Sequence, residues 1–132
     1  MKILVFGNPL VKEDNLILKI LPELQKKFPK IEFFHVDPTE NLEEYGKKLR
    51  IIDVVHGIKK PLIITDPDKL KTEKVYTMHD FDLAYNLKLL MKMKKINSIE
   101  IIGLPYNMDE KEATNYCQSI LRKWVAQDMQ GS

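Results

Sequence analysis

The sequence predicts an α/β fold: a three-layer α/β/α sandwich with a mostly parallel five-stranded sheet in which one strand is antiparallel. Apolar runs of strand length alternate with amphipathic helical segments along the chain, as in sheets covered by helices. Several of these runs are apolar throughout, which is typical of parallel strands buried on both faces. The run at 61–65 follows its predecessor too closely for a parallel crossover, so we expect it to be the antiparallel strand.

The elements up to residue 55 follow from local patterns. The first apolar run ends at a Gly-Asn-Pro turn, and the next segment has capping residues followed by apolar residues at helical spacing, with a kink at Pro22. Pro38 ends the second strand, and a short helix or helical turn precedes the third. The expected strands here are 2–6, 31–36 and 49–55, and the helices begin near 14 and 40.

The second half repeats this alternation. His56-Gly57 forms a turn before the short strand at 61–65, and a polar loop runs from Asp66 to about residue 76. Thr77 and Asp80 have the spacing of a capping box, which indicates that a helix begins here. The last expected elements are a strand at 98–104 and a helix from 109 to about 126.

Composition excludes several classes of protein. The 132 residues fit one domain, expected at 1–127, with a disordered tail at 128–132. The single cysteine cannot form an internal disulfide, and no apolar run is long enough to span a membrane. A net charge of +2 is too small to indicate nucleic-acid binding. We therefore expect a cytoplasmic monomer that binds neither a membrane nor nucleic acid.

Three side chains are candidate ligands of a metal ion. Asp14 follows the first strand, Asp53 closes the third, and His79 lies in the first turn of a helix. Ligands of parallel sheets bind at the carboxyl ends of strands, so these side chains are expected within about 4 to 6 Å of one another, around an ion with bonds of roughly 2.0 to 2.2 Å. Two carboxylates and an imidazole suit a borderline divalent metal and leave positions open for substrate or water. The alternative is that they are solvated loop acids and a helix-capping histidine.

Other residues near this edge are weaker candidates. Asp37 follows the second strand and is a candidate helper, and His56 lies close to Asp53 in sequence. Cys117 faces helix neighbours of core type, which indicates a buried thiol and not a nucleophile. The chain also lacks a G-x-S-x-G elbow, a Walker loop and the spaced glycines of a dinucleotide site.

Four stretches occur together in the order and context of one known family. They are Lys2–Asn8 with the later acid pair Glu13-Asp14, Ile51–Val55, Thr77–His79, and Ile101–Pro105. In these stretches the chain resembles the nickel-iron hydrogenase maturation endopeptidases, and three ligands of that family fall on Asp14, Asp53 and His79. Its glycine-containing loops are reduced here to Gly7 and to Asp37-Pro38-Thr39.

The resemblance implies an endopeptidase that removes the C-terminal tail of a nickel-containing hydrogenase large-subunit precursor after nickel insertion. Asp14, Asp53 and His79 would be both its catalytic residues and its nickel ligands, and the nickel would be supplied by the precursor. The reduced glycine loops favour a first alternative, a non-catalytic chaperone that binds the precursor or nickel. A second alternative is an unrelated α/β module that binds a small ligand at the same sheet edge.

Overall fold

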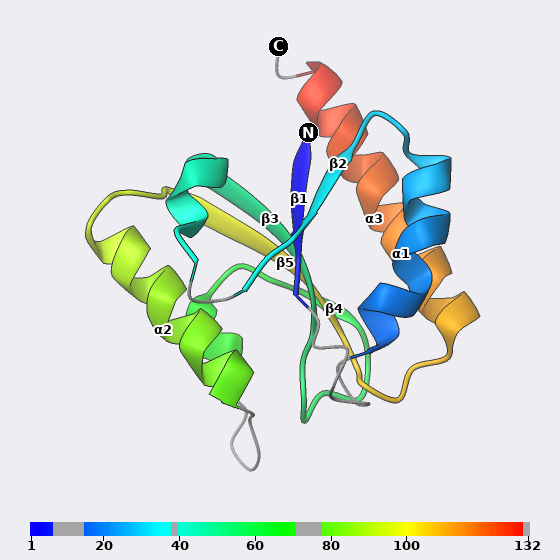
Figure 1. Cartoon of the computed structure of the whole chain (residues 1–132), viewed down its shortest axis with the longest axis horizontal. Helices are drawn as coiled ribbons and strands as arrows, with labels where there is room; N and C mark the ends of the chain where they lie inside the picture. Colours follow the sequence, from blue (N-terminus) through cyan, green and yellow to red (C-terminus); the bar gives the residue numbers. More distant parts are fainter. Residues whose placement is uncertain (7–14, 38–39, 71–77, 131–132) are drawn as a thin grey trace.

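The computed structural model describes residues 1–6, 15–37, 40–70 and 78–130, and within these ranges it describes the side chains except at 70 and 78–82. The described residues form a five-stranded sheet in the order β2-β1-β3-β5-β4 (Figure 1). In sequence the elements are β1 (Lys2–Val5), α1 (Leu16–Lys27), β2 (Glu32–His35), the 3-10 helix η2 (Leu42–Tyr45), β3 (Lys48–Val54), β4 (Leu62–Ile64), the 3-10 helix η3 (Pro67–Leu70), α2 (Met78–Lys92), β5 (Ser98–Leu104) and α3 (Glu110–Gln130).

The sheet confirms the predicted fold class. β1 pairs with β2 and β3 in parallel, β3 pairs with β5 in parallel, and β4 pairs with β5 antiparallel. β4 begins eight residues after Val54 ends β3, at Leu62, and a parallel return normally needs a dozen or more residues. The short connection therefore determines the direction of β4, as the sequence predicted.

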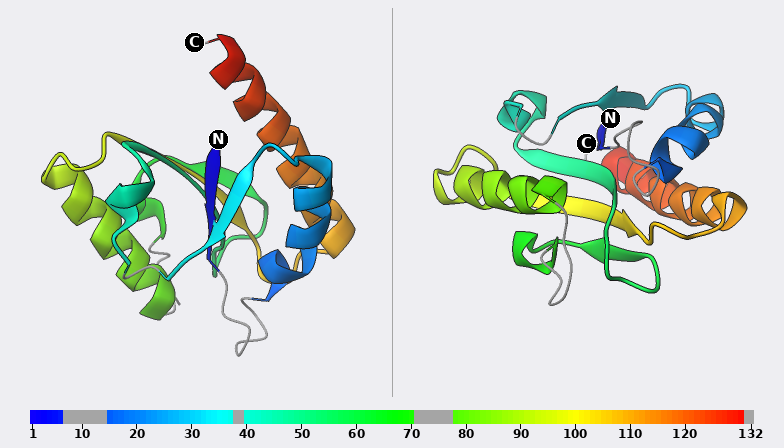
Figure 2. Two further views of the ribbon diagram at one scale, coloured as in Figure 1. Left: turned by 45° about the horizontal axis from the view of Figure 1, so that its top comes forward. Right: turned by 60° about the horizontal axis from the view of Figure 1, so that its bottom comes forward.

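Helices cover both faces of the sheet. Figure 2 shows α1 and α3 together on one face and α2 on the other. The alternation of side chains along β3 separates the two layers: Ile52 and Val54 pack with α1 and α3, whereas Ile51 and Val55 pack with α2. Each layer contains a cluster of buried apolar side chains, which explains why the strands read as largely apolar runs.

The last helix is longer than predicted. α3 continues to Gln130, so the expected helix end near Ala126 and the expected disordered tail from residue 128 are wrong for the residues up to 130. A buried arginine accounts for the difference. Arg50 is 6% exposed; its Nη1 donates to Asp128 Oδ1 at 2.8 Å, and its Nε donates to Glu100 Oε1 at 3.4 Å. The guanidinium also lies 5.2 Å from the ring centroid of Trp124.

Two local expectations differ in detail. The short helix expected at 40–49 is the 3-10 helix η2, and β3 starts directly afterwards at Lys48. Asn15 precedes α1 as expected, but its side chain makes no capping hydrogen bond. No helix in the described part of the chain is long and apolar enough to cross a membrane.

Candidate functional site

The carboxyl ends of β1, β2, β3 and β5 meet at one edge of the sheet, the lower edge in Figure 1, which we call the carboxyl edge. Backbone hydrogen bonds hold these strand ends in line. Phe6 N–H donates to the Ile52 carbonyl at 3.2 Å, Val36 N–H to the Val5 carbonyl at 3.1 Å, and Val55 N–H to the Leu104 carbonyl at 2.9 Å; these bonds bring the residues that follow the four strands to one side of the molecule.

Asp53 lies near the end of β3, one residue before its last, Val54, and is almost completely buried, with 2% of its surface exposed. Its side chain points to the α2 face, because along the strand it lies on the same side as Ile51 and Val55, which belong to one core cluster with Leu83 and Leu87 of α2. A carboxylate among apolar residues is costly to bury, and a leucine or valine would suit this position better for stability. The structure thus places a buried carboxylate at the carboxyl edge, and its role as a ligand stays a prediction.

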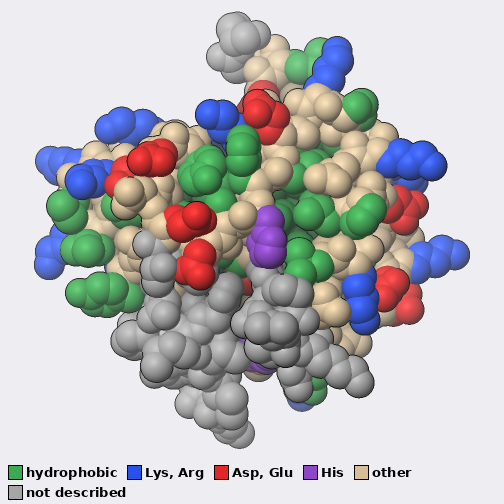
Figure 3. Space-filling view, in the orientation of Figure 1, with side chains coloured by type: hydrophobic (Ala, Val, Ile, Leu, Met, Phe, Trp, Pro, Cys, Tyr) green, Lys and Arg blue, Asp and Glu red, His purple; other side chains and the backbone are tan. Residues whose placement is uncertain are grey.

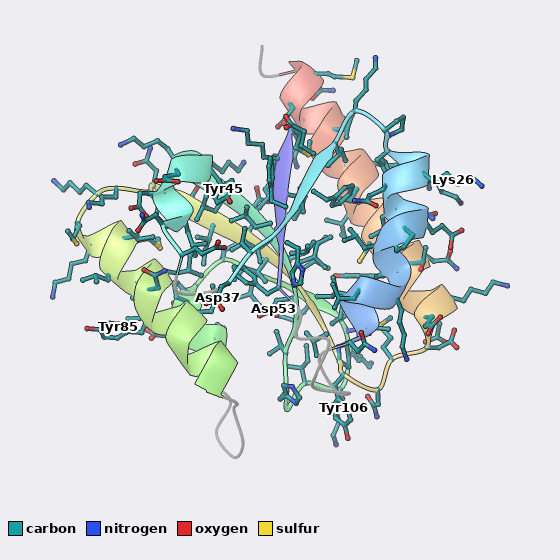
Figure 4. The ribbon with its side chains drawn as sticks, in the orientation of Figure 1. Lys26, Asp37, Tyr45, Asp53, Tyr85 and Tyr106 are labelled. Carbon is teal, nitrogen blue, oxygen red and sulfur yellow. The ribbon has the colours of Figure 1, made fainter. Side chains whose placement is uncertain are left out.

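Asp37 follows β2 at the same edge and, unlike Asp53, is exposed. Its turn is closed by two hydrogen bonds with Glu40: Asp37 N–H donates to Glu40 Oε2 at 2.7 Å, and Glu40 N–H donates to the Asp37 carbonyl at 3.0 Å. Figure 4 shows that Asp37 and Asp53 both lie between α2 and the lower end of β1. The described part of the site thus presents one buried carboxylate from the end of β3 and one exposed carboxylate from the loop that follows β2.

His79 lies in the first turn of α2, as the capping pattern predicted. The end of α2 lies at the opposite, amino edge, where Asn97 N–H in the following connection donates to the Lys47 carbonyl at 2.7 Å. The helix therefore begins at the carboxyl edge, on the face to which Asp53 points (Figure 1). The side chain of His79 and the whole of Asp14 lie outside the described residues, so their distances from Asp53 remain a prediction.

No three His, Cys, Asp or Glu side chains in the described ranges are grouped to hold a metal ion. Asp14 lies outside those ranges, and the side chain of His79 is not among the described ones. Asp53 has the donor chemistry that the prediction requires, since a carboxylate binds borderline divalent ions. Whether Asp14 and His79 join Asp53 in a ligand set therefore stays a prediction.

His56 and Tyr106 form a ring stack at the carboxyl edge. Their ring centroids are 5.6 Å apart and the ring planes differ by 13°. His56 is the third residue after Asp53, and Tyr106 is the third after Gly103, which is the register partner of Asp53. The stack thus links the loops that leave β3 and β5, and Tyr106 remains 48% exposed.

Sequence reasoning named His56 as a candidate but missed Tyr106. His56 and Tyr106 each lie three residues after one of two register partners, Asp53 and Gly103. This relation can be recognised only when the register of β3 and β5 is known. The exposed aromatic ring of Tyr106, stacked on His56 at the carboxyl edge, offers a flat surface against which a peptide can pack.

Cys117 is buried in α3, within the layer that α1 and α3 form. Burial raises the pKa of its thiol to about 12, so the nucleophilic thiolate is scarce at neutral pH. This agrees with the predicted buried thiol. Any hydrolysis at the carboxyl edge would therefore proceed without a cysteine nucleophile from this layer.

Solved structures with the same fold include two hydrogenase maturation proteases. The chain superposes on the hydrogenase maturating endopeptidase HybD from E. coli with a TM-score of 0.65 and 19% identity, covering 93% of each chain. The hydrogenase 3 maturation protease gives a TM-score of 0.62 and 20% identity, covering 89% of this chain and 86% of that one. An endopeptidase from Escherichia coli gives 0.56 and 22%, covering 80% and 74%. No family model and no curated protein matches the chain.

Proposed function

We propose that this protein is an endopeptidase that removes the C-terminal tail of a nickel-containing hydrogenase large-subunit precursor after nickel has been inserted. The observation that carries the proposal is the position of Asp53, buried at the carboxyl edge on the face to which the first turn of α2 brings His79. The fold shared with maturation endopeptidases over nearly the whole chain supports it independently. At 19–22% identity this likeness concerns the fold, so the site residues must support the activity.

The chemistry follows from holding the substrate's own metal ion beside the bond to be cut. Nickel carried by the precursor would supply a Lewis acid that polarises the scissile carbonyl and activates a water molecule. Asp14, Asp53 and His79 would bind open coordination positions of this ion. Binding through fixed side chains would hold the scissile peptide at the carboxyl edge, so that the reaction gains from proximity and orientation.

The surroundings of Asp53 favour this role. Because the carboxylate is buried among apolar side chains, it has little freedom to change rotamer and few water molecules to compete with a ligand. Asp37, exposed in the loop after β2, can interact with the part of the precursor chain that extends out of the site. The flat His56–Tyr106 stack offers a surface for the residues that flank the cleaved bond.

The test uses a nickel-iron hydrogenase large-subunit precursor from the source organism, prepared with and without nickel. Each form is incubated with the protein, and the large subunit is then weighed by intact-mass spectrometry. We expect loss of a C-terminal fragment from the nickel-loaded form only. The Asp53→Asn variant should leave the precursor uncut, whereas Glu23→Gln, the same carboxylate-to-amide change on α1, should cut at the wild-type rate.

Two results would exclude the proposal in different ways. If the nickel-loaded precursor forms a stable complex with the protein but keeps its full mass, the protein is a non-catalytic chaperone. If it neither binds nor is cut, and wild-type protein and Asp53→Asn bind nickel equally in calorimetry, Asp53 has no role in metal recognition and the site is that of a different ligand.

A further inference from the structure

Helix α2 is apolar on two sides. Its inner stripe, Leu83, Leu87 and Leu90, is buried against the sheet. A second stripe consists of Tyr85 and Leu89 of α2 and Met93, the residue after the helix end; they lie at spacings of four residues and are 61%, 41% and 53% exposed. A surface helix normally has a polar outer side, and a helix that is apolar all round is normally covered. The outer stripe is therefore an apolar surface that the described part of the chain leaves open to solvent.

The outer stripe borders a groove beside η3. The groove has a volume of about 500 Å³ and its walls come from two elements, with Tyr85, Leu89 and Met91 of α2 on one side and Asp66 and Pro67 on the other. An exposed ion pair connects the two walls, since Lys88 Nζ lies 2.8 Å from Asp68 Oδ1. We call this feature the α2–η3 groove.

One end of the α2–η3 groove is strongly basic. Lys92 lines the groove, and exposed Lys94 and Lys95 follow at the end of α2. Figure 3 shows hydrophobic and basic side chains next to one another along the left margin of the molecule, which is the α2 side. The charged side chains described along the groove and at the end of α2 give a net charge of +3. They are five lysines and two aspartates: Lys69, Lys88, Lys92, Lys94, Lys95, Asp66 and Asp68.

The shape of the groove selects the kind of segment that can fill it. The backbone groups of α2 are used within the helix, so this wall offers no row of donors and acceptors to an added strand. Contacts must come from side chains instead. From Tyr85 to Met93 the outer stripe covers a little over two helical turns, or about 12 Å, which matches the anchors of a short amphipathic helix at positions i, i+4 and i+7.

We propose that the α2–η3 groove binds an amphipathic helix of a partner protein, with apolar anchors facing Tyr85 and Leu89 and acidic residues facing Lys92, Lys94 and Lys95. The proposal goes beyond the peptidase function and does not depend on it, because none of these residues belongs to the candidate site. Apolar contacts supply the affinity, and the basic end sets the direction of the bound helix and excludes basic partners.

A display selection tests this chemistry while the partner is still unidentified. A library of helical peptides with fixed apolar anchors and randomised polar positions is selected on the wild-type protein. We expect enrichment of Asp and Glu at positions on one end of the polar face. The same library selected on the Lys92→Glu, Lys94→Glu, Lys95→Glu variant should lose this enrichment and favour Lys and Arg.

Binding of an enriched peptide is then measured by fluorescence anisotropy. We expect Leu89→Asp to weaken binding by about tenfold or more, because it replaces an apolar anchor with a carboxylate that also repels an acidic peptide. Met129→Asp is the matched control, since Met129 is 75% exposed on α3 and outside the groove. It should bind like the wild type.

Several outcomes would overturn the proposal. Failure to enrich any peptide, enrichment without an acidic bias, or equal binding by wild type and Leu89→Asp would each exclude an acidic helix as the ligand. Self-association of the wild-type protein in ultracentrifugation that Leu89→Asp abolishes would identify a second copy of this chain as the occupant. Leu89-dependent co-sedimentation with phosphatidylglycerol vesicles would identify a membrane surface instead.

Discussion

Gly103 is the position where the smallest change tests the packing behind the carboxyl edge. It pairs in register with Asp53 of β3 on one side and Leu62 of β4 on the other. A methyl group added at Gly103 would lie 3.1 Å from Val55 Cγ2, 3.2 Å from Ile64 Cδ1 and 3.5 Å from the Leu62 carbonyl oxygen. The first two distances are short for carbon atoms, so we predict that Gly103→Ala destabilises the protein.

The magnitude follows from two opposing contributions. Adding a methyl group to a packed core costs about 1–3 kcal/mol, and this site belongs at the low end because only one atom is added. Replacing glycine also restricts the unfolded chain, which stabilises the folded state by about 0.4–1 kcal/mol and offsets part of this cost. Val55 is β-branched and fully buried and cannot move aside, whereas the end of the Ile64 side chain can rotate. We therefore expect a net loss of about 1 kcal/mol in the free energy of unfolding.

Urea denaturation of a double-mutant cycle measures this directly. Ile64→Val removes the Cδ1 atom that the new methyl group would meet, and by itself should cost about 0.5–1.5 kcal/mol. In the Ile64→Val background, Gly103→Ala should cost at least about 0.5 kcal/mol less than in the wild type. Ile99→Val is the control, since Ile99 is equally buried in β5 but does not contact the new methyl group.

Two results would refute this reasoning about Gly103. A neutral or stabilising Gly103→Ala substitution would mean that Val55 and Ile64 repack without cost. Additive effects with Ile64→Val, as expected for Ile99→Val, would mean that the short contact is not the cause of any loss. Because Gly103 is the register partner of Asp53, a confirmed loss would also show that the backbone beside this carboxylate has little room to move.

The other predictions concern the site, the amino edge and the buried thiol. We expect nickel-dependent tail removal to fall by about a hundredfold or more in each of the variants His79→Ala, Asp14→Asn and Asp53→Asn. Their free energy of unfolding should change by about 1 kcal/mol or less, since removing a ligand atom leaves no large cavity. Mass spectrometry and urea denaturation on the same samples check this, and lost stability with retained cleavage would contradict it. Arg50→Met should lower the free energy of unfolding by about 1–3 kcal/mol, because it removes charge-assisted hydrogen bonds to partly exposed carboxylates. It should also lower the hydrogen-exchange protection of the backbone amides at the end of α3. Unchanged protection would refute the role assigned to Arg50. Burial raises the pKa of the Cys117 thiol from 9.0 to about 12, so its contribution to stability is complete below pH 9 and is lost as the pH rises towards 12. Iodoacetamide should accordingly label this thiol at pH 8.5 only as fast as the protein unfolds, and rapid labelling of the native protein would contradict its burial.

Local patterns predicted the fold because each element is consistent with its neighbours. The apolar runs gave the parallel strands, and the short connection before Leu62 determined the one antiparallel strand. The carboxylate of Asp53 could be placed at the carboxyl edge from sequence because it closes an apolar run in a parallel sheet. Order and strand length were sufficient for these conclusions.

Features that depend on contacts between distant residues could not be predicted. The end of α3 depends on Arg50, which is 78 residues away from Asp128, and the last turns of this helix have no apolar pattern that would mark them as ordered. The stack of His56 on Tyr106 depends on the register of β3 and β5. Such pairs follow from the tertiary arrangement, which a search for local motifs does not describe.

Two departures from ordinary patterning lie on the same side of the sheet. Asp53 puts a carboxylate where an apolar residue would stabilise the core, and the outer stripe of α2 puts apolar residues where polar ones would be expected. The layer formed by α1 and α3 holds an apolar core, and the buried charge on its side, Arg50, has acidic partners. Natural sequences depart from stable patterning mainly where function requires it. The proposed site and the proposed α2–η3 groove therefore both lie on the α2 side of the sheet.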